Sequence, residues 1–512
     1  EYFLAGKSQN WFVVGSSLFA ASVSSSTLMG HSGEGFISGI AVFNYNVGAI
    51  FVIIFVSLFF LPFYIKSGIY TIPEYLGRRF DNRSRKYFSF ITIIGNVFLD
   101  AGAALYTGAL ILKIIFPEID MMWIIIGMAL MAGTYTIIGG LSSAINADMI
   151  QSIILIAGSV LLSIFCFNSV GGWENFVEHF HDGVWLNLIR PNSDTTVPWF
   201  SIFLSIPILG FYFWGNNQVI VQRVMSAKTV NEGRLGFLFV AFLYVFTLFI
   251  FIAPGMVGRM IDLFGVGDTL HNEIIDGNTL RAQYGIDTNE VYPRLILKLL
   301  PVGLIGVMIA CMVSALTSTL SATLSSVSTL FTMDFYKSWR PESSPRHLVR
   351  VGQWTSFIAL VVAVLWAPLI GKFASLVAYY QEFSSYLAPP IVGTFLVGLF
   401  WKGSTRNGAF AGLMSGLAMS ALIMTYKFGF GGVVPFHFLL WVPILLILSV
   451  LVNIIVSKCD RNKETDVETY TWNKSVWQDD TRELKTVPWY KNFRYISIAL
   501  IIIALLEYWW FF

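Results

Sequence analysis

Charged residues are scarce in this chain of 512 residues. Asp, Glu, Lys and Arg together make up 12% of it, against about 25% in an ordinary soluble domain. Hydrophobic residues make up 56%, and the mean hydropathy is +0.69. The formal net charge is only +2, so the composition does not indicate a nucleic-acid partner. The lack of charge excludes a soluble globular domain and predicts a polytopic membrane protein in a lipid bilayer.

Cysteine is also rare. Only Cys166, Cys311 and Cys459 occur, within or beside apolar stretches and without a Cys-x-x-Cys pair. This spacing excludes a disulfide framework and indicates no zinc site. The six histidines lie mostly in loops, and no pairing of a nucleophile with a base is evident. The sequence therefore does not predict an enzyme.

Long apolar runs, in contrast, recur along the whole chain. A helix that crosses a bilayer needs about 20 predominantly apolar residues. This rule gives thirteen spans, which we place at 11–37, 41–65, 87–116, 120–139, 146–168, 198–222, 235–261, 296–331, 350–370, 373–401, 407–427, 434–457 and 493–512.

Basic residues gather in alternate loops. They are frequent at 66–86, 223–234 and 336–350, whereas the loops at 173–185 and 262–290 carry mainly Glu, Asp and His. Lys and Arg are retained on the cytoplasmic side of a membrane. This pattern predicts a multi-pass protein of the plasma (inner) membrane with its first residue cytoplasmic and, after thirteen spans, an external C-terminus.

Hydroxyls and glycines cluster in the first span, where residues 16–36 read SSLFAASVSSSTLMGHSGEGF. At membrane depth, backbone leaves helical geometry only where it lines a cavity or is buried in protein. Such a segment needs glycines and local hydroxyl partners. The cluster therefore favours a broken helix, although small residues can also serve close helix packing.

A second interrupted span follows five spans later. Residues 205–222 read SIPILGFYFWGNNQVIVQ and contain Pro207, Gly210 and Gly215 among apolar residues. Two broken helices five spans apart predict an inverted repeat of five plus five helices, with the solute site between them. We expect a transport core at 1–401, with repeats at 11–168 and 198–401. Residues 402–512 would add further transmembrane helices and a cytoplasmic loop.

The eighth span carries a stripe of hydroxyls. They recur at steps of three and four residues, at Ser314, Thr317, Ser318, Ser321, Ser325 and Ser328. This spacing places them on one helix face. Oxygen ligands without a carboxylate suit a hard monovalent cation, whereas the alternative is bonding of Ser and Thr back to the preceding turn.

Several motifs carry a family resemblance from Glu1 to about Gly412. They read EYFLAGKS, YTIPEYLGRRF, GGLSSAINADMIQ, WGNNQVIVQRVMSAK, STLFTMDFY and YYQEFSSYLAPPIVGTFLVGLFWK. The sequence resembles the sodium/solute symporter family, most of all its sodium/glucose cotransporter branch. The resemblance implies a leucine-transporter-type core in the first ten spans and sodium-coupled symport. It also implies an additional N-terminal helix, which this sequence lacks.

The same resemblance implies a sodium site between the first and eighth spans. By motif register, its ligands are the backbone carbonyls of Ala20, Val23 and Ala315 with the hydroxyls of Ser318 and Thr319. Carbonyls released by an unwound helix and two adjacent hydroxyls would bind a monovalent ion weakly enough to release it.

Asp148 matches an acidic position near a second sodium site or ion path in some family members. An intramembrane carboxylate is a functional hypothesis by default, although this one could instead cap its helix; we favour the ion path. Ala21 and Ala322 stand where Ser occurs in the second site. We therefore expect one sodium ion per cycle.

The resemblance also implies a solute site. Gln381 matches a glutamine that binds sugar hydroxyls, and its amide offers both a donor and an acceptor. The other expected contacts differ from those of sugar transporters, because Asn46 replaces an acid, Thr27 a glutamine or histidine, and Tyr244 a frequent lysine. The expected solute-binding residues are Thr27, Asn46, Gly210, Tyr244 and Gln381, with Tyr45 and Phe213 as aromatic gates.

These residues favour a small neutral polyhydroxylated solute, such as a monosaccharide or polyol. An anion carrier would offer Arg, Lys or a helix N-terminus to its substrate, and no Arg or Lys falls in the inferred pocket. A monocarboxylate, sialic acid or amino acid carrier stays an alternative. A sodium channel or a sensor could use the same ion site.

Overall fold

The computed structural model describes residues 9–511 except 68, 70, 140, 193, 195, 267–276, 374, 433, 435, 461–469 and 486. Side chains are also left undescribed at 66, 67, 135–152, 474–476, 479 and 483. The described chain is helical almost throughout, as an apolar chain in a bilayer must be, because only intrachain bonds can satisfy its backbone there.

The first half of the chain forms α1 (Trp11–Ser22), α2 (Ser25–Ser38), α3 (Phe43–Phe59), α4 (Leu61–Ser67), α5 (Ile72–Arg79), α6 (Asn82–Ile94), α7 (Gly102–Ile115), α8 (Met121–Gly139), α9 (Leu141–Ser169), α10 (Trp173–His179), α11 (Trp199–Leu204), α12 (Ile206–Phe211), α13 (Gln218–Met225), α14 (Val230–Val245) and α15 (Ala253–Met260). The second half forms α16 (Gly277–Tyr284), α17 (Val291–Leu299), α18 (Val302–Leu330), α19 (Lys337–Trp339), α20 (Pro345–Ile370), α21 (Leu376–Phe400), α22 (Arg406–Met424), α23 (Phe438–Cys459), α24 (Lys474–Leu484) and α25 (Phe493–Trp510).

Shorter segments join some of these helices. The 3-10 segments are η2 (Gly39–Val42), η7 (Thr288–Glu290) and η11 (Trp489–Lys491). The π-helical segments are η3 (Gly95–Ala101), η4 (Tyr212–Asn216), η5 (Leu248–Ile252), η8 (Phe331–Tyr336) and η9 (Thr425–Gly429).

The prediction of an all-helical polytopic membrane protein is confirmed. Within the described residues, nine helices are long and apolar enough to cross a bilayer, or up to eleven if each of two bent pairs counts as one span. Trp11–Ser22 and Met121–Thr134 are shorter apolar helices. Each of the thirteen expected ranges contains a helix, but α2 continues through η2 into α3, so the boundaries of the first two spans differ from those expected.

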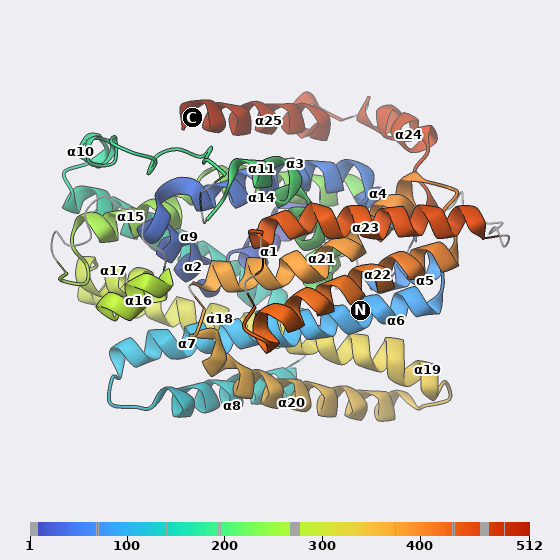
Figure 1. Ribbon diagram of the computed structural model, residues 1–512, viewed down its shortest axis with the longest axis horizontal. Helices are drawn as coiled ribbons and strands as arrows, with labels where there is room; N and C mark the ends of the chain where they lie inside the picture. The colour runs from blue at the N-terminus through green and yellow to red at the C-terminus, as the bar shows by residue number, and fades with distance from the viewer. Residues whose placement is uncertain are drawn as a thin grey trace.

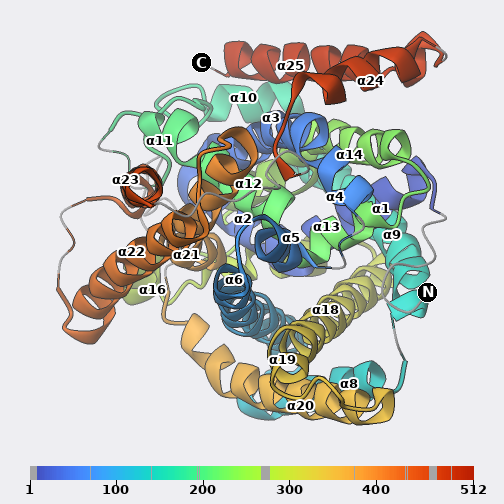
Figure 2. The ribbon, with the colours of Figure 1, turned by 90° about the vertical axis from the view of Figure 1, so that its right-hand side faces the viewer.

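The long helices run roughly along one axis of the molecule, horizontal in Figure 1. Seen closer to end-on, α8 and α20 form one edge of the bundle, while α24 and α25 lie on the opposite edge (Figure 2). The helices α21, α22 and α23 pack together as a further group. Between these layers, α1, α2, α12, α13 and α18 surround the centre of the bundle.

The first span is broken at the expected place. The N–H of Val23 donates to the carbonyl of Phe19 at 2.8 Å, after which the chain leaves the helix. Ser24 is extended, and its hydroxyl accepts the N–H of Thr27 as the N-cap of α2. The last carbonyls of a helix have no following turn to bond, so this break frees backbone oxygens at the centre of the protein.

The sixth span is broken as well. Its π-helical segment η4 ends at Asn216, and Asn217 is extended with a ψ of 121°. The Asn217 side chain then accepts the N–H of Val219 at 2.9 Å and starts α13. The polar cluster in the sequence therefore marks a cap at a helix break, as expected for a pair of discontinuous helices.

Glycines allow two close crossings near the first span. A Cβ on Gly15 of α1 would lie 2.9 Å from the carbonyl oxygen of Gly236 in α14. On the other half of the span, a Cβ on Gly255 of α15 would lie 2.0 Å from the carbonyl oxygen of Ser32 in α2. Both halves of the broken helix are therefore held against the seventh span by backbone contact that a side chain would prevent.

Candidate ion and solute sites

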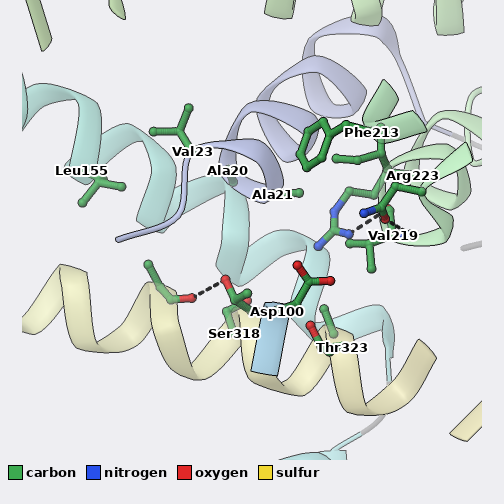
Figure 3. A pocket seen from close by; sticks show the side chains of 15 residues that line it. Ala20, Ala21, Val23, Asp100, Leu155, Phe213, Val219, Arg223, Ser318 and Thr323 are labelled. Carbon is green, nitrogen blue, oxygen red and sulfur yellow. Dashed lines mark hydrogen bonds between the residues drawn. The ribbon is translucent and has the colours of Figure 1, made fainter. Parts of the chain in front are cut away.

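A small cavity of about 60 Å³ lies beside the break in the first span. It contains all five residues of the expected sodium site: Ala20, Val23, Ala315, Ser318 and Thr319. Figure 3 shows α1 on one side of this cavity and α18 on the other. Because α1 ends at Ser22, the carbonyls of its last turn are the oxygens that the first span presents there.

The hydroxyls of α18 bond back to their own helix, and some of them also line the small cavity. Thr317, Thr319 and Thr329 each donate to the carbonyl one turn earlier, at 2.9 Å. Of these three, only Thr319 lines the cavity, and its hydroxyl donates to the carbonyl of Ala315. A hydroxyl that donates its proton keeps lone pairs on its oxygen. Bonding back to the helix is therefore compatible with binding a cation.

Other hydroxyls of the first span tie it to its neighbours. Ser25 donates to the carbonyl of Met312 in α18 at 2.8 Å, and Ser26 shares a hydrogen bond of 3.1 Å with Thr107 in α7. Thr27 donates to the carbonyl of Ser22 across the break at 3.1 Å. These bonds fix the position of α2 relative to α18, and hence the geometry of the small cavity.

A larger cavity of about 200 Å³ adjoins the small one. A cavity that holds one water molecule has a volume of roughly 10–15 Å³. The larger cavity therefore has room for a solute of monosaccharide size. All seven residues expected at the solute site line it: Thr27, Tyr45, Asn46, Gly210, Phe213, Tyr244 and Gln381. The structure therefore brings the residues expected at the solute site together around one cavity.

Some polar side chains of this cavity already have a hydrogen-bond partner within the protein, and others do not. Asn46 is buried and donates to the hydroxyl of Thr247 at 2.7 Å. The amide of Gln381 makes no hydrogen bond to the described residues, so its donor and acceptor both remain for a solute. Gly210 serves helix packing in addition, since a Cβ there would lie 3.1 Å from the Val52 side chain.

Aromatic rings form much of the wall of the larger cavity. Tyr244 packs edge-on against Trp214 and Phe19, with ring centroids 5.4 and 6.1 Å apart. Phe213 packs edge-on against Trp214 at 5.2 Å and lines both cavities. Phe213 therefore lies between the two cavities, whereas Tyr45 lines only the larger one; the gate role of both rings stays a prediction.

Sequence reasoning missed several residues of the larger cavity. The polar ones include His31, Asp100, Tyr212, Tyr380 and Ser384. Tyr380 stands beside Gln381 in a quoted motif and could have been found there. Asp100 is a single acid in the apolar third span, a signal by the same rule that singled out Asp148. Asp148 itself lies in the part of α9 whose side chains are outside the described residues, and its role stays a prediction.

The charges of the two cavities differ. Among the described residues that line the larger cavity there is no Lys or Arg, and Asp100 is its one carboxylate. The small cavity has both Asp100 and Arg223 in its wall. The expectation that no basic residue approaches the site thus holds for the larger cavity, while Arg223 approaches the smaller one from α13 (Figure 3).

Comparison with known proteins gives the family. The profile of the Sodium:solute symporter family matches residues 2–416. The Vibrio parahaemolyticus sodium/glucose cotransporter is 34% identical over 433 residues, which cover 83% of this chain and 79% of that protein. Solute carrier family 5 member 4 of Rattus norvegicus is 32% identical over 495 residues, covering 89% and 73%. The sodium/mannose cotransporter of Bos taurus is 33% identical, covering 83% and 74%.

Solved structures share the fold. A sodium-coupled sialic acid symporter in a substrate-bound, outward-open state superposes with a TM-score of 0.74 at 22% identity, covering 90% of this chain and 93% of that one. Mhp1, a nucleobase-cation-symport-1 family transporter, gives a TM-score of 0.52 at 13% identity, covering 91% and 97%. At these identities the likeness concerns the fold, which is the leucine-transporter-type arrangement expected from the resemblance.

Proposed function

The chain belongs to the sodium:solute symporter family, and from that premise we propose that it imports a small neutral polyhydroxylated solute, a monosaccharide or polyol, together with sodium. Symport requires the ion and the solute to act on the same moving parts. The observation that carries the proposal is that the two cavities share part of their walls, through Ala21, Asp100, Phe213 and Thr319.

The shared wall links both proposed sites to the broken first helix. The sodium ligands Ala20 and Val23 lie at the end of α1, and the solute-facing Thr27 lies on the first turn of α2. Sodium at the small cavity would hold the end of α1 against α18 and so stabilise the position of α2. A ligand can shift a conformational equilibrium only by binding one state better, and sodium bound across this break does so.

The lining of the larger cavity supports a neutral solute with hydroxyl groups. Its amides, hydroxyls and aromatic rings include the free amide of Gln381, a donor and acceptor pair that suits a polyol. A carboxylate solute would meet Asp100 without a Lys or Arg among the described lining residues to compensate for the repulsion. Relatives named for glucose or mannose transport are consistent with this class.

Alternating access follows from the proposed inverted repeat. We assign its halves to 11–168 and 198–401, each beginning with a discontinuous helix, and the following residues to additional helices. In such folds, one set of helices moves against the other around a fixed central site. With sodium more concentrated outside and the inside negative, the driving force on the coupled sodium ion directs net transport inward.

The test is uptake by proteoliposomes with a panel of radiolabelled sugars, polyols, monocarboxylates, sialic acid and amino acids, with and without a sodium gradient. We expect accumulation of a sugar or polyol only with the gradient, while potassium does not replace sodium. Accumulation of an anion or amino acid would assign another solute. Uptake that equilibrates without ever exceeding the external concentration would contradict symport and indicate a channel.

A further inference from the structure

A groove on the outer surface of the helix bundle belongs to neither of the two sites. It lies between α9, α14 and η5 and has a volume of about 650 Å³. Ten of its twelve described lining residues are apolar, and the other two are Ser163 and Asn168. Of the apolar ones, Val160, Ile164 and Phe246 are 42%, 49% and 44% exposed. Because these elements belong to candidate membrane spans, the groove faces lipid.

The groove has an apolar end and a polar end. Along α9 it extends from Ile156 to Asn168, a rise of about 18 Å at 1.5 Å per residue. Its apolar end includes Phe19, in the last turn of α1 before the break in the first span. At its polar end, Asn168 is exposed and Trp173 packs against Phe167 with ring centroids 5.7 Å apart. Trp rings favour the level of the lipid headgroups. One leaflet of a hydrocarbon core about 30 Å thick measures about 15 Å, so the length and polarity of the groove match a single acyl chain.

Between its ends, the groove has one polar side chain among the described lining residues, that of Ser163. Its hydroxyl donates to the carbonyls of Ser159 in α9 and Phe249 in η5, and so ties two walls of the groove together. An acyl chain can therefore cover the groove without leaving a buried polar group unpaired. A polar or charged ligand would lose its hydration there without gaining a partner, which is costly.

The groove and the small cavity lie on two sides of the same backbone. In α1, Ala20 lines the small cavity and the preceding Phe19 lines the groove. In α9, which packs against α1, Leu155 lines the small cavity and the following Ile156 lines the groove. The carbonyl of Phe19 also accepts the N–H of Val23, the last bond before the break. A molecule at the apolar end of the groove therefore contacts the turn of α1 that carries the proposed sodium ligands.

We propose that the groove binds one acyl chain of a membrane phospholipid, whose end packs against Phe19, and that the bound chain strengthens sodium binding. Phe19 is then held between the chain and Tyr244, whose ring centroid lies 6.1 Å from its own, and this stabilises the last turn of α1. Neither Lys nor Arg is among the described lining residues, which favours a phospholipid without net charge, since anionic lipids bind at basic pockets. The lipid site stands by itself, whereas its effect on sodium rests on the proposed function.

The test uses the full chain in nanodiscs of phosphatidylcholine that contain a small fraction of the same lipid with a photoreactive diazirine at the end of one acyl chain. After illumination, mass spectrometry of the peptides identifies the labelled residues. We expect labelling of Phe19 that saturates as the fraction of photoreactive lipid rises. Phe19 is only 2% exposed, so a chain seated in the groove reaches it and passing lipid does not.

Two variants of α9 test the position of the chain. Ile164→Trp adds a ring within the groove and should lower the labelling of Phe19 about tenfold, because the chain would be overpacked. Ile153→Trp is the matched control and should be labelled like wild type, since Ile153 is 50% exposed on the same helix but is not among the described lining residues. Labelling that never saturates, or that Ile164→Trp leaves unchanged, would overturn the site. An unlabelled protein that is dimeric in the nanodisc would assign the groove to a second copy and overturn it too.

The effect on the ion site is measured by linkage, because two ligands that strengthen each other's binding do so by the same factor. In wild type, half-maximal labelling of Phe19 should need about fivefold less photoreactive lipid in sodium than in potassium, at the lower end of typical couplings between two sites. Replacing Ser318 and Thr319 together with Ala should remove this difference. Equal labelling of wild type in both ions would overturn the link to sodium. Uptake that does not depend on sodium would instead contradict the proposed function, and saturable labelling would then still show the lipid site.

Discussion

Among the hydroxyls of α18, Thr319 and Thr317 make the same bond but face different surroundings. Each donates to a carbonyl one turn earlier at 2.9 Å, while only Thr319 lines the two cavities. This contrast provides a matched pair of variants. The hydrogen bond to the helix is common to both residues, so any difference between the variants reports on the cavity.

The first prediction uses this pair. Replacing Ser318 and Thr319 together with Ala should abolish sodium-driven solute uptake, because two of five proposed oxygen ligands disappear while the backbone carbonyls remain. Thr317→Ala should retain uptake, since it removes only the bond to Val313. Sodium dependence of uptake is measured in proteoliposomes. An unchanged sodium dependence of the double variant would remove the ion from this position.

The second prediction concerns Gln381. Gln381→Leu keeps the side-chain size and deletes both hydrogen-bonding groups, which leaves solute hydroxyls unpaired at a cost of about 1–3 kcal/mol. The apparent affinity for solute should fall roughly tenfold or more, since about 1.4 kcal/mol corresponds to a factor of ten. Sodium binding without solute should stay the same.

Gln353→Leu is the control for this variant, because Gln353 is exposed on α20, away from both cavities. It makes the same chemical change and should transport with wild-type affinity. If Gln381→Leu does so too, the solute lies elsewhere and the assignment to a polyol loses its main support.

At the scale of residues, the sequence predicted the members of the cavities better than their contacts. The resemblance supplied Thr27, Asn46, Tyr244 and Gln381, and these four line one cavity. The bond from Asn46 to Thr247 could not be predicted, because these residues are brought together only by the packing of α3 against the end of α14. Asp100 carried a signal as the single acid of an apolar span, but the cavity that it lines could not be predicted. Which way it faces depends on the π-helical segment around it.

Among the elements, the broken helices were predictable because their signals are local. A cap needs a polar side chain within two or three residues of the N–H that it accepts, as Ser24 and Asn217 show. The π-helical segments were not predictable. Each extra residue in a turn rotates the following side chains by roughly 100° relative to an α-helix. No local residue pattern in η3 or η4 announces that rotation.

The third prediction concerns the contact between α2 and α15. Gly255→Ala would place a Cβ 2.0 Å from the backbone oxygen of Ser32, so the two helices must separate. Overpacking of this kind costs about 1–3 kcal/mol. Since α2 begins at the break beside the small cavity, we expect both a lower melting temperature in detergent and weaker sodium activation of uptake.

Gly306→Ala is the control for that change. A Cβ on Gly306 of α18 meets nothing within 4 Å, and Ala is favoured over Gly within a helix by about 1 kcal/mol. The melting temperature should therefore stay the same or rise. A Gly255→Ala protein that melts and transports like wild type would show that α2 and α15 can separate without consequence for the site.

At the scale of the whole molecule, the two ends of the described chain contact different loops, of which one is rich in basic residues and the other is not. The N–H of Gln9 donates to Ser226 in a basic loop, and the carbonyl of Phe511 accepts from Leu188 in the loop after α10. In Figure 1, α5, α19 and α24 gather at one end of the bundle, and α10, α16 and α17 at the other. The number of spans and the direction of the chain across the membrane stay predictions.

A basic residue that was used to predict the membrane orientation also forms an ion pair between two helices. Arg85 donates two hydrogen bonds to Asp334 in η8, at 2.6 and 2.9 Å, and Ser89 bonds the same carboxylate. Counting positive residues predicted on which side Arg85 lies but not this pair, because the two residues are 249 positions apart. The STLFTMDFY motif thus includes a carboxylate that joins α6 to the end of α18.

The last prediction concerns the driving force, which distinguishes one coupled cation from two and a symporter from a channel. One sodium ion that enters down a tenfold gradient releases about 1.4 kcal/mol, and a potential of about 100 mV adds roughly 2.3 kcal/mol for its charge. One ion can therefore sustain a gradient of a neutral solute of roughly several hundred-fold, and two ions can sustain a gradient of about 10⁵-fold.

Vesicles under these conditions are loaded with solute at about a thousandfold excess over the outside, and the direction of net solute flux is measured. With two cations per cycle, labelled solute should still enter on balance, whereas with one cation it should leave. Removing either the sodium gradient or the potential should lower the solute gradient at which net flux is zero. With equal sodium on both sides and no potential, the solute should only equilibrate; accumulation under those conditions would contradict sodium coupling altogether.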